Sequence, residues 1–88
     1  MSHTSAEELE NKLKNARQEI EIGGVYSHYK TPEHKYIVEF IGILEEKEEV
    51  CVGYRALYEN GILWVRTLEN FVEEVDISNS KTSRFIKI

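Results

Sequence analysis

The spacing of apolar residues changes at Gly23-Gly24, and this change constrains the fold more than any other feature of the chain. Before the two glycines, apolar side chains recur at helical spacing along one stripe, which is formed by Leu9, Leu13, Ala16 and Ile20. After them, short runs rich in β-branched and aromatic residues alternate with turn residues, a pattern typical of strands. The sequence therefore predicts an N-terminal amphipathic helix within residues 1–22 and a small β domain over residues 23–88.

The predicted helix has a clear beginning. Ser5 and Glu8 have the spacing of a capping box, in which the serine hydroxyl accepts a hydrogen bond from the Glu8 backbone N–H. Residues 1–4 before it are polar, and we expect them to fray. Because the apolar stripe is narrow, we expect the helix to lie on the β domain or on a second copy of itself.

The β domain is predicted to hold four or five short strands. We expect them over residues 25–30, 35–44, 49–58, 62–66 and 84–88. The first four are separated by three turns, at Thr31-Pro32-Glu33, at the charged run 45–48 and at Asn60-Gly61. The Asn-Gly pair is a strong hairpin signal.

The segment between the fourth and the last strand breaks the β pattern. Thr67 is expected to cap a single helical turn over residues 67–72. An extended segment is expected over residues 73–77, and a polar loop over residues 78–83. These elements favour a mainly β fold with one N-terminal helix, built on a small, strongly bent sheet or an SH3-like barrel. The alternative is an α+β sandwich, in which the helix covers one face of a flat sheet.

Composition excludes several classes of function. Sixteen acidic against eleven basic side chains give a net charge of −5, which argues against sequence-independent nucleic-acid binding. No apolar run approaches the ~20 residues that span a bilayer, and no secretory signal is visible, so we expect no membrane partner. Cys51 is the single cysteine and lies in an apolar run, where it is expected to be a small buried hydrophobe. A cytoplasmic location fits these features best.

No motif of known enzymatic chemistry is present. The chain has no glycine-rich phosphate loop, no paired-cysteine motif and no nucleophile motif. Its three histidines are His3, His28 and His34, and no cysteine lies near them in the sequence to complete a metal site. We therefore predict a protein that is not an enzyme and that uses no metal or cofactor.

Aromatic and cationic side chains alternate on neighbouring predicted strands. Side chains two residues apart on a strand share a face, as do Trp64 and Arg66. Such surfaces combine flat rings with oriented hydrogen-bond donors, and they are typical of binding sites. The candidate ligand-binding residues are Tyr26, His28, Lys30, Arg55, Tyr58, Trp64 and Arg66. The alternative is that the rings fill the core and that Arg66 pairs with Glu69 or Glu74.

At these residues the chain resembles a known bacterial family of short proteins. The similarity lies in the blocks Tyr26-Ser27-His28-Tyr29-Lys30, Tyr54-Arg55-Ala56-Leu57-Tyr58, Leu63-Trp64-Val65-Arg66 and Arg84-Phe85. The family is the one catalogued as domain of unknown function 1653, and the resemblance runs from about Gly24 to Ile88. It implies a compact domain and draws attention to its polar and aromatic positions, but it brings no activity.

Three functional hypotheses follow. The leading one is a binding or adaptor domain that recognises a protein segment or a small anionic ligand through the aromatic and cationic surface. The second is a structural protein that forms homodimers through Leu9, Leu13 and Ile20. The third is a β-barrel that binds single-stranded nucleic acid by base stacking, against which the acidic balance argues.

Overall fold

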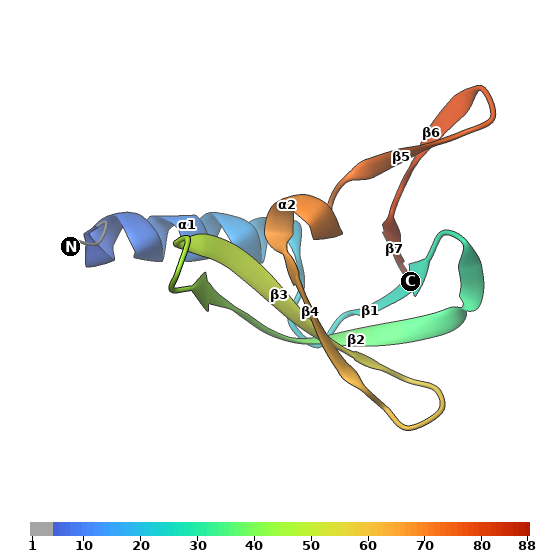
Figure 1. Ribbon diagram of the computed structural model, residues 1–88, viewed down its shortest axis with the longest axis horizontal. Coiled ribbons are helices and arrows are strands. Elements are labelled where there is room, and N and C mark those ends of the chain that lie inside the picture. The colour runs from blue at the N-terminus through green and yellow to red at the C-terminus, as the bar shows by residue number, and fades with distance from the viewer. Residues whose placement is uncertain (1–4) are drawn as a thin grey trace.

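The computed structural model describes residues 5–88 and shows a long N-terminal helix lying beside a bent antiparallel sheet, from which a small hairpin projects (Figure 1). The expectation for residues 1–4 lies outside the described residues. The elements in chain order are α1 (Ala6–Glu19), β1 (Val25–His28), β2 (Thr31–Leu44), β3 (Glu49–Ala56), β4 (Leu63–Thr67), α2 (Leu68–Phe71), β5 (Glu74–Ile77), β6 (Ser80–Ser83) and β7 (Phe85–Lys87).

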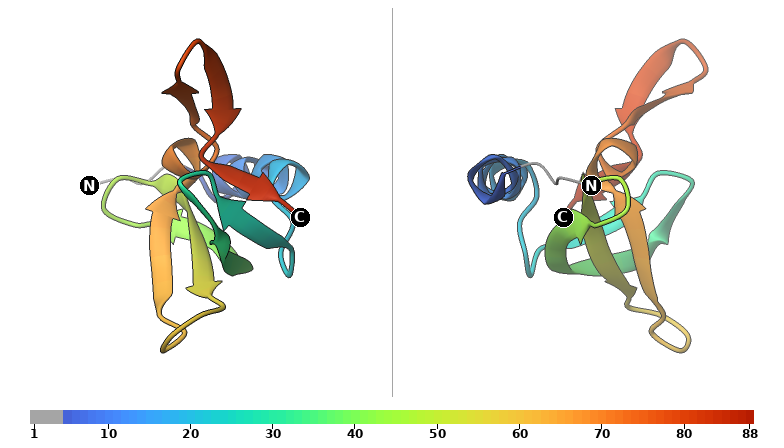
Figure 2. Two further views of the ribbon diagram at one scale, coloured as in Figure 1. Left: turned by 90° about the vertical axis from the view of Figure 1, so that its right-hand side faces the viewer. Right: turned by 60° about the vertical axis from the view of Figure 1, so that its left-hand side comes forward.

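The main sheet has five strands in the order β4-β3-β2-β1-β7, and β5 and β6 form a separate two-stranded sheet. The pairing of β2 with β3 shifts register between Val38 and Phe40, and such an irregularity bends and twists a strand. The predicted mainly β fold with a strongly bent sheet is confirmed. The predicted closed barrel is wrong, because the edge strands β4 and β7 do not pair with each other (Figure 2).

Side chains occupy the place where a closed barrel would need backbone pairing. The ring of Phe71, from α2, stacks on Phe85 of β7 with the ring centroids 4.3 Å apart. The Phe71 ring also meets Tyr54 of β3 edge to face, with the ring centroids 5.3 Å apart. Aromatic contacts therefore join the two ends of the sheet instead of a hydrogen-bonded ladder.

The predicted turn at Thr31-Pro32-Glu33 is wrong by two residues. The first strand ends at His28, and His28 already pairs with Thr31 across a turn at residues 29 and 30. The next pair is Ser27 with Lys35, so three residues of β2 bulge out of the ladder. Pro32 lies in this bulge, where its missing N–H breaks no ladder hydrogen bond.

The predicted polar loop over residues 78–83 is also wrong. Residues Ser80–Ser83 form β6, which pairs with β5 in register from Ile77 opposite Ser80 to Glu74 opposite Ser83. Ser78 makes the reversal with a positive φ of 46°. The strand is polar and exposed, so it carries no apolar alternation by which the sequence would reveal it.

The two predicted helix caps are confirmed. The Ser5 side chain accepts a hydrogen bond from the Glu8 backbone N–H at 3.2 Å, and α1 follows. The Thr67 hydroxyl accepts one from the Asn70 backbone N–H, also at 3.2 Å, and α2 follows. The cap at Thr67 matters for the core, because it starts the short helix that presents Phe71.

The helix α1 is packed on the sheet by the C-terminal part of its stripe. Ala16 and Ile20 are buried, while Leu9 and Leu13 are half-buried. Within residues 5–88, none of the helices has the length and apolar character needed to cross a bilayer. The core lies on the concave face of the sheet and consists of Ile20, Tyr26, Tyr36, Val38, Val52, Tyr54, Ala56, Phe71 and Phe85.

The packing predicts that Phe71→Ala destabilises the protein far more than the neighbouring change Val72→Ala. Phe71 is 1% exposed and fills the centre of the aromatic cluster, so its truncation leaves a cavity and should cost about 3–5 kcal/mol. Val72 is 38% exposed, and its truncation should cost less than about 1 kcal/mol. Urea unfolding followed by circular dichroism measures both values. Similar midpoints for the two variants would contradict this account of the core.

Candidate functional site

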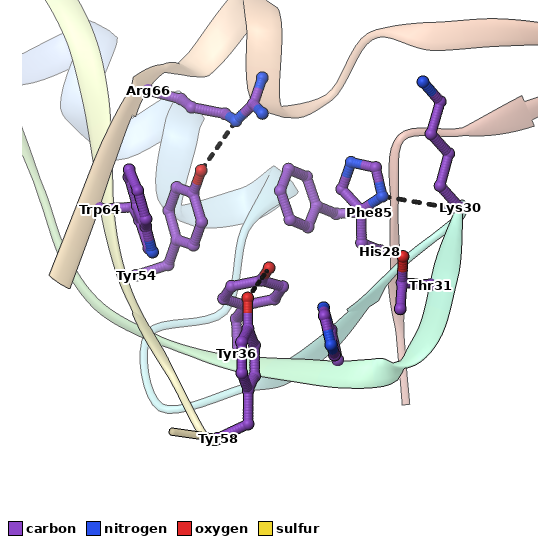
Figure 3. Close-up of a pocket in the computed structure, with 10 residues that line it drawn as sticks. His28, Lys30, Thr31, Tyr36, Tyr54, Tyr58, Trp64, Arg66 and Phe85 are labelled. Atoms are coloured by element: carbon purple, nitrogen blue, oxygen red, sulfur yellow. Dashed lines mark hydrogen bonds between the residues drawn. The ribbon is translucent and has the colours of Figure 1, made fainter. Parts of the chain in front are cut away.

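A cavity of about 310 Å³ opens where the aromatic core meets solvent, and all five strands of the main sheet contribute to it (Figure 3). The β1–β2 turn forms one side and β4 forms the other. We refer to this cavity as the strand-end pocket. It is lined by His28, Lys30, Thr31, His34, Tyr36, Tyr54, Tyr58, Trp64, Arg66 and Phe85.

Three buried rings give the strand-end pocket a firm apolar wall. Tyr36, Tyr54 and Phe85 come from β2, β3 and β7, and they meet edge to face with centroids between 5.2 and 5.7 Å apart. Each ring is at most 9% exposed. Because the same rings belong to the core, the packing that stabilises the fold also holds this wall in place.

Two tyrosine hydroxyls supply polar groups in the lower part of the pocket as Figure 3 shows it. The hydroxyl of Tyr36 lies 2.6 Å from that of Tyr58, which reaches in from the loop after β3. The His34 ring stacks on Tyr58 with centroids 4.0 Å apart. Burial, followed by the hydrogen bond to Tyr58, raises the pKa of Tyr36, so this hydroxyl stays protonated and can donate.

Arg66 is held on the opposite side by neutral partners. Its Nε donates to the Tyr54 hydroxyl at 2.7 Å, and its Nη1 donates to the Asn70 side-chain oxygen. The guanidinium also lies over the Phe85 ring, 5.5 Å from the centroid. In the part of the chain that the structure describes, no carboxylate lies within 4.0 Å of Arg66. The predicted alternative in which Arg66 pairs with Glu69 or Glu74 is therefore wrong.

His28 is a neutral donor next to these cations. Its Nδ1 accepts a hydrogen bond from the Lys30 backbone N–H at 3.1 Å, so in the neutral ring the proton is on Nε2. Burial lowers the pKa of His28 below 6.5, and the positive charges of Arg66, Arg84 and Lys30 lower it further. The imidazole is thus poor at carrying a charge of its own until an anion enters.

The charges that line the strand-end pocket have one sign. Lys30 and Arg66 are cations, His28 and His34 are imidazoles, and no acidic residue lines the cavity. The chain as a whole carries sixteen acidic and eleven basic side chains, so this lining is opposite to the average of the molecule. A cationic cavity with aromatic walls is suited to hold an anionic group.

The structure brings together five of the seven residues nominated from the sequence, namely His28, Lys30, Tyr58, Trp64 and Arg66. Tyr26 is instead in the core, where its hydroxyl accepts from the Glu21 backbone N–H at 3.1 Å. Arg55 lies on the other face of the sheet and forms an ion pair with Glu39 at 2.7 Å. These two residues do not reach the pocket.

The pocket also contains residues that were not nominated from the sequence. They are Thr31, His34, Tyr36, Tyr54 and Phe85. The period-two rule places His34 and Tyr36 on one strand face, so this signal was available for them. No local signal exists for Phe85, because it reaches the pocket only through the pairing of β7 with β1.

The described residues contain no group of three or more His, Cys, Asp and Glu side chains arranged to hold a metal ion. Two of the histidines, His28 and His34, line the strand-end pocket without such a third ligand. His3 lies outside the described residues.

The fold and the pocket define a small β domain with an open, bent sheet and a cationic, aromatic cavity at one end. The chain belongs to the family described as protein of unknown function (DUF1653), whose model matches residues 24–87. It is similar to a member of that family from Bordetella bronchiseptica with a known crystal structure. The two share 30% sequence identity with a TM-score of 0.68, over 81% of this chain and 90% of that one. None of the proteins with curated descriptions is similar enough in sequence to count as a relative.

The site predicts that the pKa of His28 is below 6.5 in the folded protein. Because the unfolded chain then binds more protons, the contribution of His28 to stability is complete above pH 6.5 and is lost as the pH falls from there towards the folded pKa. NMR titration of the imidazole measures the pKa. Urea unfolding at about pH 7.5 and about pH 5.5 should show that the free energy of unfolding falls less on acidification in His28→Gln than in the unmodified protein. A folded pKa at or above 6.5 would contradict this description of the pocket.

Proposed function

We propose that this domain is a binding module and that the strand-end pocket receives an anionic group, carried by a small ligand or by a protein segment. One observation carries the proposal. An acidic chain has gathered Lys30, Arg66 and two imidazoles around a single cavity that no carboxylate lines. Cations held against apolar rings lose part of their hydration, and a bound anion offsets that cost.

The geometry provides donors on several sides of the cavity. Arg66 is fixed by Tyr54 and Asn70, so its guanidinium does not have to be ordered when a ligand binds. The Nε2–H of His28 supplies a second donor, and the exposed Lys30 supplies a solvated charge at the entrance. Fixed donors in a partly desolvated cavity bind an anion more tightly than the same groups do on an open surface.

The other two hypotheses find less support. A single-stranded nucleic acid needs a groove with several stacking rings in sequence, whereas Trp64 is the one ring at the pocket that is more than 40% exposed. Homodimer formation through α1 needs its apolar stripe to be free. Ile20 is buried in this chain's own core, and Leu9 and Leu13 are half-buried.

The proposal is for binding without chemistry. The hydroxyl with the clearest polar partner is that of Tyr36, but its raised pKa keeps it protonated, and the partner is another tyrosine hydroxyl. Cys51 is buried, and burial raises the pKa of its thiol. Neither group is an activated nucleophile with an adjacent base.

We predict that pyrophosphate binds to the pocket and that Lys30→Gln weakens this binding by about two- to fivefold, the effect of losing one solvated charge. Trp64 is the only tryptophan, so its fluorescence reports occupancy of the cavity. Lys81→Gln is the matched control, because it removes the same charge from β6, whose residues do not line the pocket.

The pyrophosphate affinity measured by fluorescence titration should fall in Lys30→Gln and should stay the same in Lys81→Gln. Equal weakening in both variants would show that only the net charge of the molecule matters. Absence of any response to pyrophosphate, sulfate or acetate would remove the proposed function.

A further inference from the structure

The strand β4 is an unprotected edge of the main sheet. It pairs with β3 on one side and with no strand of the described chain on the other (Figure 2). Three consecutive apolar residues on it are exposed: Leu63 by 39%, Trp64 by 49% and Val65 by 56%. Natural edge strands are usually guarded by proline, by outward charges or by a covering element. β4 contains no proline, and its one charged side chain, Arg66, is turned into the strand-end pocket.

The register shows which backbone groups this edge offers. The Ala56 N–H donates to the Ile62 carbonyl at 2.9 Å, and the next pairs of β3 and β4 are Arg55 with Leu63 and Tyr54 with Trp64. In an antiparallel ladder, hydrogen-bonded and non-hydrogen-bonded pairs alternate. The backbone groups of Trp64 and Arg66 therefore face β3. Those of Leu63 and Val65 face outward, where an incoming strand would find them.

The side chains on β4 divide between the two faces of the sheet. Trp64 and Arg66 line the strand-end pocket, while Leu63 and Val65 point to the opposite face. A strand added to this edge would continue both faces. Its alternate side chains would lie next to Trp64 and Arg66 on the pocket side, and next to Leu63 and Val65 on the other side.

We propose that an extended segment of a partner protein adds to β4 as a further strand and places an acidic side chain in the strand-end pocket beside Arg66. The inference rests on the proposed function and names the carrier of the anion. The segment alternates acidic residues, which face the pocket, with β-branched apolar residues, which cover Leu63 and Val65. Its backbone bonds to the outward groups of β4 give affinity, and the alternation gives specificity.

Charge complementarity favours such a segment over a second copy of this chain. Arg66 has no carboxylate partner within the described residues, and Lys30 lines the same cavity. β4 itself contains no acidic residue, so self-pairing of two β4 edges would leave Arg66 without an opposite charge. An acidic segment would supply this charge and would cover the exposed apolar residues at the same time.

The test uses capped eight-residue peptides that alternate Val, Ile or Thr with Glu, and a matched set in which Gln replaces Glu. The peptides with Glu should bind and those with Gln should bind at least about tenfold more weakly, because they lack the charge that pairs with Arg66.

Val65→Pro removes an N–H that faces outward and not one that pairs with β3, so the added strand loses a hydrogen bond and meets the proline ring. Its affinity for the peptides should fall at least about tenfold, whereas Val65→Ala, which keeps the N–H, should bind within about threefold.

Pyrophosphate binding separates this inference from the proposed function. Val65→Pro should bind pyrophosphate like the unmodified protein, which also shows that its pocket is intact. Peptides N-methylated at alternate amides provide a second test that does not depend on that variant. Methylation of the amides that face β4 should abolish binding, and methylation of the amides that face away from β4 should not.

Equal peptide binding by Val65→Pro and Val65→Ala would overturn the inference, and so would equal binding of the Glu and Gln peptides. No effect of methylation on either set of amides, or a homodimer in light scattering that Val65→Pro dissociates, would overturn it as well. If pyrophosphate binds and no peptide does, the strand addition fails while the anion pocket stands. If neither binds, both fail.

Discussion

The stacking of Phe71 on Phe85 is the contact on which the rest of the structure depends. The two rings lie nearly parallel, 4.3 Å apart, and Tyr54 and Tyr26 meet Phe71 edge to face. A bent sheet of five strands leaves two edges that do not meet, and this cluster of rings connects them. Aromatic pairs stabilise by dispersion and by burial of large apolar area, and they do not require the strand alignment that a hydrogen-bonded ladder would. The sheet can therefore remain open while its core is closed.

An open sheet has a consequence for the surface. The aromatic core continues to the ends of β1 and β4, where no element of the described chain covers it, and the strand-end pocket lies there. The core rings form its wall, and the polar side chains around them come from strand ends and turns. Function in small β domains is commonly placed in this way, because strand ends are fixed by the sheet while their side chains are free to vary. In this chain the polar side chains at these places include two cations, Lys30 and Arg66, and two imidazoles, His28 and His34.

The same openness leaves β4 as an edge beside that cavity. A side chain on the pocket face of a strand added there would lie next to Arg66, and the two binding features would then serve one partner. The net negative charge of the chain disfavours contact with acidic chains in general, whereas Lys30 and Arg66 at the strand-end pocket would favour an acidic segment there.

Much of the fold followed from local patterns. The helical stripe that ends at Ile20, the caps at Ser5 and Thr67 and the pairing of β3 with β4 are confirmed, because each depends on residues close together in the chain. The site was predictable in part. Alternation placed Trp64 and Arg66 on one face, and alternation likewise placed Arg55 on the other, where it pairs with Glu39.

The sequence by itself determined most of the extended segments of the main sheet, the alternation of their side chains and where α1 and α2 begin, since these depend on steric preference and on periodicity over a few residues. The tertiary structure alone decided that Tyr26 is core and not site, that β6 is a strand and that the sheet stays open. It also brought Phe85 into the pocket beside His28, although the two residues are far apart in the sequence. Those outcomes depend on which distant rings pack together, and no local pattern specifies that choice.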